Sequence, residues 1–552
     1  MSPSSPAHAA AHDALGTGYD DADSEDDDDD DEAFPATGDT IYALSTGHGR
    51  AGIAVIRISG PSCLDVYKAL CPAKALPRPR CAAVRTLWEP EEPSRQPVML
   101  DAQALVLYFP APASVTGEDV LELHVHGGPA TVKATLAALS RCRSRRPVRY
   151  AEPGEFTKRA FVNDRLDLGQ VEALSDTLAA ETEQQRRAAV RGSSGALGRS
   201  YDSWRQRLLL ARAELEALID FSEDQHFDES PSELLASVAD QVGRILDAIR
   251  VHELAGQRSE LLRNGIRIAL LGPPNAGKSS LMNLVVGREA SIVSSEAGTT
   301  RDIVEANLDV RGYLCSFADT AGFRSERLSP VGGVEAEGIR RARRRARESD
   351  LVVALASIEL GPDGPFVQYE AETLELAAGA AACLVVVNKR DRVEGRTLEA
   401  LLGRFRQTLG GQSRALAAAE PLAISCKQGR SAARGSADPG GIQGVVEALA
   451  SAFGRMTDMP PHLQDLLGVT ERQGQLLARC RQHLEAFMAE AGRRPGDGDD
   501  DDGGDGTGGD VMVAAEYLRY AADCLARITG RGEAGDVEEL LGVVFEKFCV
   551  GK

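Results

Sequence analysis

The pattern of hydrophobic and polar positions divides the chain into zones of different texture. Residues 39–163 hold short apolar runs such as "GIAVIRISG" and "VLELHVHGG" between turn residues, with one or two helical stretches, which predicts a compact α+β domain. Residues 164–263 and 459–552 have helical periodicity and few strand formers, as in "WRQRLLLARAELEALIDF" and "VMVAAEYLRYAADCLARI". In residues 264–458, apolar runs such as "IRIALLG" and "CLVVVNK" alternate with helical stretches, which is typical of a mostly parallel sheet covered on both faces. We therefore predict a multidomain α/β and α protein, in which an α+β domain is followed by a helical domain that carries an inserted α/β domain.

Two acidic tracts dominate the net charge of -21. Residues 20–32 carry 11 acidic side chains and residues 497–510 carry 7, and neither tract contains a basic residue. Because both tracts lack the apolar residues that offset the entropy of ordering, we predict a disordered tail over residues 1–38 and a disordered insertion over residues 495–510. Without the two tracts the net charge is about -3, so the charge does not argue against a nucleic-acid partner.

Cysteine usage and hydropathy narrow the class of protein further. The 10 cysteines are scattered, without a CxxC pair or a His/Cys cluster at zinc spacing, which favours reduced thiols in a reducing compartment. No run approaches the roughly 18 apolar residues of a membrane span. The N-terminus is acidic, whereas organelle transit peptides are rich in arginine and poor in acidic residues, so it predicts no targeting address.

The stretch "GPPNAGKSS" (residues 272–280) follows an apolar strand directly and opens a helix, which is the context that a phosphate-binding loop requires. Backbone N–H groups of such a loop and of the helix N-terminus surround phosphates. Lys278 is expected to reach the β- and γ-phosphate oxygens, and the hydroxyl of Ser279 is expected to bind Mg²⁺.

Four further motifs, "GTTRD", "DTAG", "NKRD" and "SCK", follow in the order and at the spacing typical of a GTPase. Thr300 is placed to sense the γ-phosphate and to complete the Mg²⁺ shell, and Asp391 is expected to accept the ring N–H and the exocyclic amine of guanine. The predicted GTP-binding residues are Asn275, Ala276, Gly277, Lys278, Ser279, Ser280, Thr299, Thr300, Asp319, Thr320, Ala321, Gly322, Asn388, Lys389, Asp391, Ser425, Cys426 and Lys427.

The residue after "DTAG" is Phe323, where Ras-like proteins place a glutamine that orients the attacking water. A phenylalanine cannot do this, so the hydrolytic machinery must come from another side chain, a partner or a cation. Asn275 could supply an oxygen ligand to a monovalent cation beside the phosphates. It could equally be a simple turn residue.

Several longer motifs resemble those of one family, the tRNA uridine-modifying GTPases of the MnmE (TrmE) type. They are "DTIYALSTGHGRAGIAVIRISGP", "TGEDVLELHVHGGP", "PGEFTKRAFVNDRLDLGQVEAL", "GPPNAGKSSLMN", "DTAGFR" and the terminal "FCVGK". The resemblance covers almost all of residues 39–552 and leaves out the tail and the acidic insertion. It implies a folate-binding N-terminal domain that forms a homodimer, a helical domain, and a Ras-like P-loop G domain inserted into the helical domain.

The resemblance also implies an activity and its cofactors. Such proteins use GTP, Mg²⁺, K⁺ and a tetrahydrofolate derivative, either 5,10-methylene- or 5-formyl-tetrahydrofolate. With an FAD-containing flavoprotein of the MnmG/GidA type, they install an aminomethyl-type group, carboxymethylaminomethyl or taurinomethyl, on carbon 5 of a tRNA wobble uridine.

Individual site residues follow from the same resemblance. The implied potassium ligands are Asn275, Ser294, Glu296 through its backbone, and Thr299. The implied folate-binding residues are Arg57, Glu122, Arg165 and Lys552. Glu335 matches the catalytic glutamate that orients the attacking water, in place of the missing glutamine. Cys549 would lie near the one-carbon unit, where it could be a nucleophile or only a small buried residue. At position 165 some relatives carry lysine, and arginine keeps the charge with a different geometry.

Other patterns leave alternatives open. His124 and His126 share one face of a strand and could bind a metal, although no third ligand is evident. The basic runs at residues 141–149 and 340–349 could contact phosphates or form solvated faces, and the first run is the better candidate for contact with tRNA.

Two other functions would suit the GTPase motifs. A ribosome-assembly GTPase acting as a switch could share the P-loop and the hydrophobic residue after "DTAG", although it would have no use for a folate-type domain or the terminal "CVGK". A regulatory GTPase that has lost the modification chemistry would fail to bind folate. The N-terminal motifs resemble eukaryotic organellar members, so the mitochondrion is the favoured location, ahead of plastid or cytoplasm.

Overall fold

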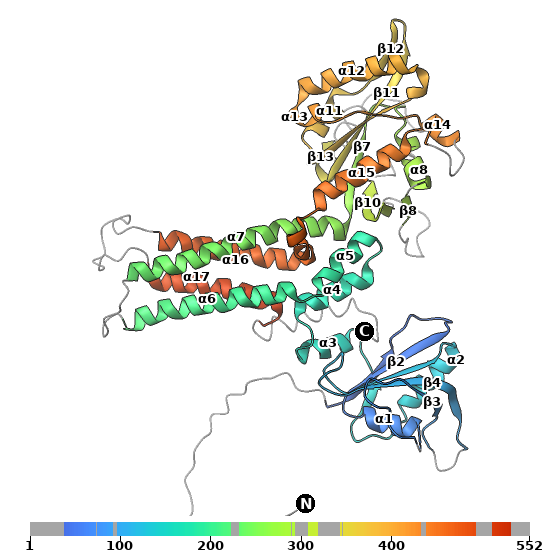
Figure 1. Ribbon diagram of the computed structural model, residues 1–552, viewed down its shortest axis with the longest axis vertical. Coiled ribbons are helices and arrows are strands. Elements are labelled where there is room, and N and C mark those ends of the chain that lie inside the picture. The colour runs from blue at the N-terminus through green and yellow to red at the C-terminus, as the bar shows by residue number, and fades with distance from the viewer. Residues whose placement is uncertain are drawn as a thin grey trace, which may run out of the picture. The chain divides into compact units, whose positions relative to one another are not determined.

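The computed structural model describes residues 38–72, 74–91, 96–221, 231–288, 290–292, 307–317, 343–344, 346–431, 438–492 and 510–531. Contacts divide the chain into two units, Met1–Gly38 and Asp39–Lys552, and the elements described below belong to the second. They confirm the predicted class, since an α+β part, a helical part and a part with a mostly parallel sheet are all present (Figure 1).

The N-terminal part is built on a six-stranded sheet with the order β3-β4-β5-β2-β1-β6. All neighbouring strands are antiparallel except β1 and β6, which are parallel. The strands are β1 (Thr40–Leu44), β2 (Ile53–Ser59), β3 (Ala83–Trp88), β4 (Met99–Phe109), β5 (Val120–His126) and β6 (Val148–Tyr150).

Alternation along β2 and β5 explains how the two faces of this sheet differ. Ile56 and Leu123 are fully buried in a core that includes residues of α1 (Cys63–Leu70) and α2 (Pro129–Leu139). The intervening side chains point to the other face, because side chains alternate along a strand. That face is covered in part by α3 (Glu155–Val162), whose Phe156 packs against β1.

The "TGED" motif forms a turn that binds α3 to the sheet. Gly117 has a φ of 83°, and a Cβ at this position would lie 2.6 Å from Cβ of Asn163. Asn163 Nδ2 donates to the carbonyl of Thr116 at 2.7 Å, and Arg159 Nη1 donates to the carboxylate of Glu118 at 3.1 Å. These contacts explain the glycine and the acid of the motif as structural residues.

The helical part contains two segments that lie far apart in the sequence. Its helices are α4 (Leu168–Ala179), α5 (Glu183–Gly192), α6 (Ala196–Phe221), α7 (Pro231–Asn264), α16 (Glu471–Ala491) and α17 (Val511–Thr529). The four long helices α6, α7, α16 and α17 lie side by side and share one apolar core, in which Leu215, Val242, Phe487 and Leu518 are fully buried (Figure 1).

Glu172 of α4 joins the two segments at the start of α16. Its carboxylate accepts hydrogen bonds from Thr470 Oγ1 at 2.9 Å and Arg472 Nε at 2.6 Å. Thr470 and Gln473 also form a capping box that begins α16. The acid of the "GQVEAL" motif therefore ties α4 to a helix almost 300 residues further along the chain.

An eight-stranded sheet lies between α7 and α16 in the sequence, with the order β14-β13-β11-β7-β10-β9-β8 and with β12 paired to β11. The strands from β14 to β10 are parallel, and β9, β8 and β12 pair antiparallel with their neighbours. The strands are β7 (Ile266–Leu271), β8 (Ala290–Ile292), β9 (Asn307–Val310), β10 (Tyr313–Phe317), β11 (Leu351–Gly361), β12 (Gly364–Gln368), β13 (Ala382–Asn388) and β14 (Leu422–Ala423).

Helices cover both faces of this sheet, as the near-continuous apolar strands predict (Figure 1). On β11, Val353 shares an apolar core with α8 and α15, whereas its neighbour Val352 shares one with α11, α12 and α13. These helices are α8 (Lys278–Arg288), α11 (Ala371–Ala378), α12 (Gly395–Gln412), α13 (Arg414–Ala417) and α15 (Ile442–Thr457), and α14 (Cys426–Ser431) follows β14. Within the described residues, no helix combines the length and the apolar character that a membrane span requires.

Candidate functional sites

The predicted phosphate-binding loop connects β7 to α8. Gly272 has a φ of 149°, and a Cβ there would lie 2.1 Å from the carbonyl oxygen of Leu355. Asn275 takes a left-handed conformation with a φ of 63°, and α8 begins at Lys278. The ammonium group of Lys278 donates to the carbonyl of Gly272 at 2.7 Å. The loop thus brings a lysine and the N–H groups of a helix N-terminus together, which is the arrangement that binds phosphates.

Asn388 links three of the predicted GTP-binding motifs. Its Nδ2 donates to the carbonyl of Ala276 in the phosphate-binding loop at 2.7 Å. Its Oδ1 accepts from the backbone N–H of Lys389 at 2.7 Å and from that of Cys426 at 3.1 Å. A Cβ at Gly277 would lie 2.2 Å from Asn388 Nδ2, so a side chain at 277 would displace this amide. One buried side chain therefore holds the "GPPNAGKSS", "NKRD" and "SCK" loops in a single site.

Asp391 is oriented by the last of these loops. Ser425 Oγ donates to Asp391 Oδ1 at 2.5 Å, and Ser425 Oγ in turn accepts from the backbone N–H of Gln428 at 3.1 Å. Asp391 itself is exposed. A carboxylate that is fixed through one oxygen and open through the other suits recognition of two adjacent N–H groups on a guanine.

Glu359 completes this region, although no sequence motif pointed to it. It lies near the end of β11 and forms ion pairs with Lys389 and Arg392. Burial acts to raise the pKa of Glu359, but the hydrogen bonds from Lys389 and Ser357 outweigh it and hold the pKa below its usual value. The anion therefore anchors the lysine of "NKRD", whose backbone has a left-handed φ of 67°.

Cys426 contributes its backbone rather than its thiol. Burial raises the pKa of Cys426 to about 11, so the thiol is neutral at physiological pH. Lys427 is exposed, in the first turn of α14. Ser280 accepts a hydrogen bond from Arg430 Nη2 of α14 at 2.9 Å, as one more link between the phosphate-binding loop and the "SCK" loop.

The remaining predicted residues of hydrolysis and cation binding fall outside the described part of the chain. Asn275 and Ser279 are described, with Asn275 exposed in the loop and Ser279 half-buried in the first turn of α8. The predicted site residues outside the described residues are Ser294, Glu296, Thr299, Thr300, Asp319, Thr320, Ala321, Gly322, Glu335, Cys549 and Lys552.

The N-terminal sheet brings two of the predicted folate-binding residues together. Arg57 and Glu122 face each other on β2 and β5. Arg57 donates to Glu122 Oε1 from Nε at 3.1 Å and from Nη2 at 3.0 Å. The Arg57 guanidinium also lies 6.0 Å from the ring centroid of Phe156 on α3. The side chains of Arg57 and Glu122 remain 23% and 15% exposed, so a ligand can reach the pair.

Arg165 is held by a different part of the same domain. Its Nε donates to the carbonyl of Ser114 at 3.1 Å, in the turn that leads to Gly117. Among the described residues, no hydrogen bond or ion pair joins Arg165 to Arg57 or to Glu122. The structure therefore unites two of the four predicted folate ligands and leaves the role of Arg165 as a prediction.

His124 and His126 have separate partners. His124 Nε2 lies 3.2 Å from Glu122 Oε2, and His126 Nδ1 lies 2.9 Å from Asp101 Oδ2. Burial acts to raise the pKa of Asp101, but the backbone N–H groups of His126 and Gln103 and the His126 ring lower it overall. Within the described residues, no three His, Cys, Asp or Glu side chains are grouped as a metal site would need.

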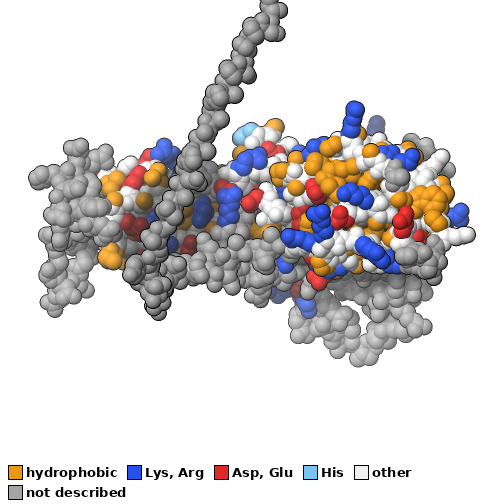
Figure 2. Space-filling view, turned by 90° about the horizontal axis from the view of Figure 1, so that it is seen from below, with side chains coloured by type: hydrophobic (Ala, Val, Ile, Leu, Met, Phe, Trp, Pro, Cys, Tyr) orange, Lys and Arg blue, Asp and Glu red, His pale blue; other side chains and the backbone are white. Residues whose placement is uncertain are grey.

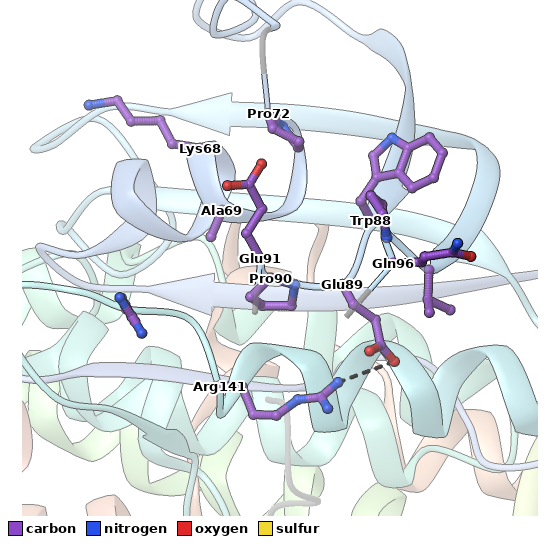
Figure 3. Close-up of a pocket in the computed structure, with 12 residues that line it drawn as sticks. Lys68, Ala69, Pro72, Trp88, Glu89, Pro90, Glu91, Gln96 and Arg141 are labelled. Carbon is purple, nitrogen blue, oxygen red and sulfur yellow. Dashed lines mark ion pairs between the residues drawn. The ribbon is translucent and has the colours of Figure 1, made fainter. Parts of the chain in front are cut away.

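A hollow of about 850 Å³ opens elsewhere in the N-terminal part (Figure 3). It is lined by the ends of α1 and β3 and by the segments that follow β3 and α2, including Lys68, Trp88 and Arg143. At its rim, Arg141 Nη2 pairs with Glu89 Oε1 at 3.2 Å. None of the predicted folate or nucleotide residues lines it, but it lies where the basic run of residues 141–149 begins.

The surface around the N-terminal part is mixed in character. Figure 2 shows lysine and arginine side chains interspersed with acidic ones, beside a gathering of hydrophobic side chains. Exposed apolar residues of this part include Val84, Val98 and Met99, at 61%, 48% and 50% exposure. The positive charge is therefore local rather than a broad single-sign field.

Comparison with known families and proteins covers nearly the whole chain. Residues 40–165 match the family model described as "GTP-binding protein TrmE N-terminus", and residues 168–549 match that of the "MnmE helical domain". The chain is 41% identical over 515 residues to the tRNA modification GTPase MnmE of Parvibaculum lavamentivorans, covering 93% of this chain and 100% of the relative.

Two eukaryotic proteins are similar over the same extent. The human protein named "5-taurinomethyluridine-[tRNA] synthase subunit GTPB3, mitochondrial" is 38% identical over 525 residues, covering 94% of each chain. The Schizosaccharomyces pombe protein named "tRNA modification GTPase mss1, mitochondrial" is 37% identical over 524 residues, covering 93% of this chain and 95% of the relative.

Proposed function

Because the chain belongs to the MnmE (TrmE) family of tRNA modification GTPases, we propose that it couples GTP hydrolysis to modification of carbon 5 of a tRNA wobble uridine. The chain is a GTP hydrolase of tRNA modification. The observation that best supports GTP binding is the set of hydrogen bonds of the Asn388 side chain, called here the Asn388 junction. It holds the phosphate-binding loop and both predicted guanine-recognition loops in one site.

The chemistry of hydrolysis is assigned by family resemblance. Ser279 and Thr300 would bind Mg²⁺, and Asn275, Ser294, Glu296 and Thr299 would bind K⁺ beside the phosphates. A cation at this position stabilises charge that develops on the phosphate oxygens. Glu335 would orient the attacking water. The left-handed backbone of Asn275 is compatible both with this role and with a plain turn.

The proposed folate site is centred on Glu122. A pterin presents two parallel N–H groups, and an accessible carboxylate can accept both of them. Arg57 holds this carboxylate in place through two hydrogen bonds. Arg165 and Lys552 would supply positive charge to the glutamate tail of the folate, and Cys549 would lie near the one-carbon unit.

The proposed partners follow from the relatives and from the basic run. A relative named as a synthase subunit acts with at least one other protein, and we expect an FAD-containing flavoprotein here. The substrate is tRNA, for which residues 141–149 are the candidate contact. We further expect a homodimer formed through the N-terminal domain, and a mitochondrial location, since the human and Schizosaccharomyces pombe relatives are named mitochondrial.

The test is nucleoside mass spectrometry on tRNA from a strain that lacks its own enzyme of this type. The strain is complemented with the intact chain or with a copy that ends before Cys549, together with the flavoprotein partner native to this chain. We expect the intact chain to restore the modified wobble uridine and the truncated copy to fail. If the intact, expressed chain hydrolyses GTP and restores nothing, a ribosome-assembly or regulatory GTPase becomes the better description.

A further inference from the structure

The two oxygens of the Glu122 carboxylate have different partners. Oε1 accepts from Arg57 on the neighbouring strand β2, and Oε2 lies 3.2 Å from Nε2 of His124 on the same strand β5. Residues 122 and 124 are two apart on one strand, so their side chains share a face of the sheet. The carboxylate is therefore held from two directions, across the sheet by an arginine and along the strand by a histidine.

The residues opposite His124 on the neighbouring strands are apolar. The strand register places His124 opposite Val55 on β2 and opposite Leu105 on β4. The His124 side chain is 23% exposed, which equals the exposure of Arg57. Its neighbour His126 is 68% exposed and is bonded to Asp101, so it does not take part in this arrangement.

An oriented carboxylate matters for a ligand whose N–H groups must meet it in one plane. The last torsion of a glutamate side chain is broad and has no strong intrinsic preference. A carboxylate has about four lone-pair positions; two N–H groups of Arg57 on Oε1 and Nε2 of His124 on Oε2 take three of them and leave one, on Oε2, to a ligand. A donor on each oxygen therefore sets the plane of the group before the ligand arrives, which reduces the ordering needed on binding.

We propose that His124 is a positioning residue of the folate site, donating from Nε2–H to Glu122 Oε2 so that the carboxylate is presented in the plane that a pterin requires. This inference rests on the proposed folate site. It assigns a role in the binding of the pterin to a histidine that the sequence suggested only as a metal ligand. The imidazole donates through a single N–H, which leaves the remaining lone-pair position of Oε2 to an N–H group of the ligand.

The experiment measures binding of 5-formyl-tetrahydrofolate to the full-length chain by isothermal titration calorimetry. His124→Leu removes the donor, and His124→Gln keeps an N–H donor on a side chain of similar reach. We expect His124→Leu to weaken the affinity about tenfold, as for loss of one hydrogen bond to a charged group. We expect His124→Gln to stay within about twofold of the wild type. Melting temperature and folate-free GTP hydrolysis are measured in parallel and should not change.

Two controls separate this inference from the folate site itself. Glu122→Gln should abolish binding, and His126→Leu should leave it unchanged, since His126 is bonded to Asp101.

If the wild type binds, Glu122→Gln does not, and His124→Leu binds normally, then His124 has no positioning role although the folate site is present. If His124→Leu and His124→Gln weaken binding equally, the proposal that His124 acts by donating a hydrogen bond to Glu122 is wrong. If the wild type does not bind at millimolar ligand, the folate site fails and this inference fails with it. Should His124→Leu not fold, His124→Met, which also lacks a donor, replaces it.

Discussion

Asn388 Nδ2 donates to the carbonyl of Ala276 at 2.7 Å, between two residues that lie 112 positions apart in the chain. The same side chain accepts from the backbone N–H of Cys426, a further 38 positions along. The strand order explains the meeting, because β7, β11 and β13 are parallel neighbours and their carboxyl ends lie at one edge of the sheet. Ligands of open α/β sheets bind at this edge. We therefore expect recognition of the phosphates and of the base to depend on one shared amide.

Gly277→Ala tests this junction without removing a functional group. A methyl at 277 would lie 2.2 Å from Asn388 Nδ2, and the backbone there has a φ of 104°, so the amide must move. We expect GTP affinity to fall at least about 100-fold, which corresponds to about 3 kcal/mol. The measurement is the dissociation constant for GTP by fluorescence titration.

Gly287→Ala is the matched control for that substitution. Gly287 also lies in α8, and a Cβ there meets nothing within 4 Å. Because alanine is favoured over glycine inside a helix by about 1 kcal/mol, this variant should bind GTP normally and melt slightly higher. Equal loss of affinity in both variants would contradict the account of the junction.

Asp391→Asn tests the assignment of the base-reading carboxylate. An amide in this position presents a donor where guanine also presents a donor, so GTP affinity should fall by about 3 kcal/mol or more. Xanthosine triphosphate, whose ring carries a carbonyl in place of the exocyclic amine, should regain affinity. Competition binding with both nucleotides provides the measurement. Asp363→Asn, in the turn between β11 and β12, is the control and should leave the preference for GTP intact.

The free energy of unfolding should depend on pH in part because of His252, a buried histidine of the helical part. His252 is 7% exposed, its Nδ1 lies 3.1 Å from Tyr201 Oη, and burial lowers the pKa of His252 to about 4. In the unfolded chain the group titrates near 6.5, so the unfolded state binds more protons between these values. Protonation of His252 therefore does not affect the free energy of unfolding above about pH 6.5. As the pH falls from there towards 4, it lowers the free energy of unfolding by up to roughly 3 kcal/mol.

Denaturant unfolding followed by circular dichroism measures the free energy of unfolding at about pH 7 and about pH 5, on either side of the pKa of His252 in the unfolded chain. The loss of stability on acidification should be smaller in His252→Phe than in the wild type. His462→Gln alters an exposed histidine and should leave the loss unchanged. The same pH dependence in all three proteins would show that other groups are responsible.

The junction at Glu172 should be important for stability. Its carboxylate is 13% exposed and pairs with Arg472, whose other nitrogens donate to the carbonyls of Arg527 and Ile528. Breaking a largely buried pair by changing one partner leaves the other charge uncompensated, so Glu172→Gln should destabilise the chain by about 3 kcal/mol. Glu216→Gln, at a more exposed i,i+4 pair with Arg212, should cost less than about 0.5 kcal/mol. Urea unfolding distinguishes the two, and similar effects would rule out a special role for the junction.

Contact between tRNA and the basic run should appear in the salt dependence of binding. Arg143 and Arg145 are both exposed in the segment that follows α2. If each contacts a phosphate, the double change to glutamine should weaken tRNA binding and lower the slope of log K against log salt by roughly 1 to 2. Arg344→Gln, in the other basic run, is the control, since Arg344 is 79% exposed and paired with Glu348. An unchanged slope in the double variant would remove residues 141–149 from the tRNA contact.

The sequence predicted much of this architecture because its signals are local. The phosphate-binding loop is recognisable from glycine spacing between a strand and a helix, and the apolar runs predicted a sheet covered on both faces. That Arg57 and Glu122 belong to one site could be predicted only from the family resemblance, because the spacing of residues does not set the register of β2 against β5.

Contacts that depend on tertiary packing were not predictable. Glu359 carries no motif, and its ion pair with Lys389 exists because β11 extends beyond its pairing with β13. His124 suggested a metal because of its spacing from His126, whereas the structure gives the two rings different acidic partners. Apart from Asn275, the predicted potassium ligands lie outside the described part, as does the chain end, so their roles remain predictions.

The most direct test of the central claim is reconstitution of the reaction from purified components. The chain is combined with its flavoprotein partner, unmodified tRNA, a methylene-tetrahydrofolate, an amine donor and either GTP or ATP in potassium buffer, and nucleosides are analysed by mass spectrometry. The account predicts an aminomethyl-type group on the wobble uridine with GTP only, and none with Gly277→Ala. A chain that hydrolyses GTP under these conditions and leaves the uridine unmodified would contradict it.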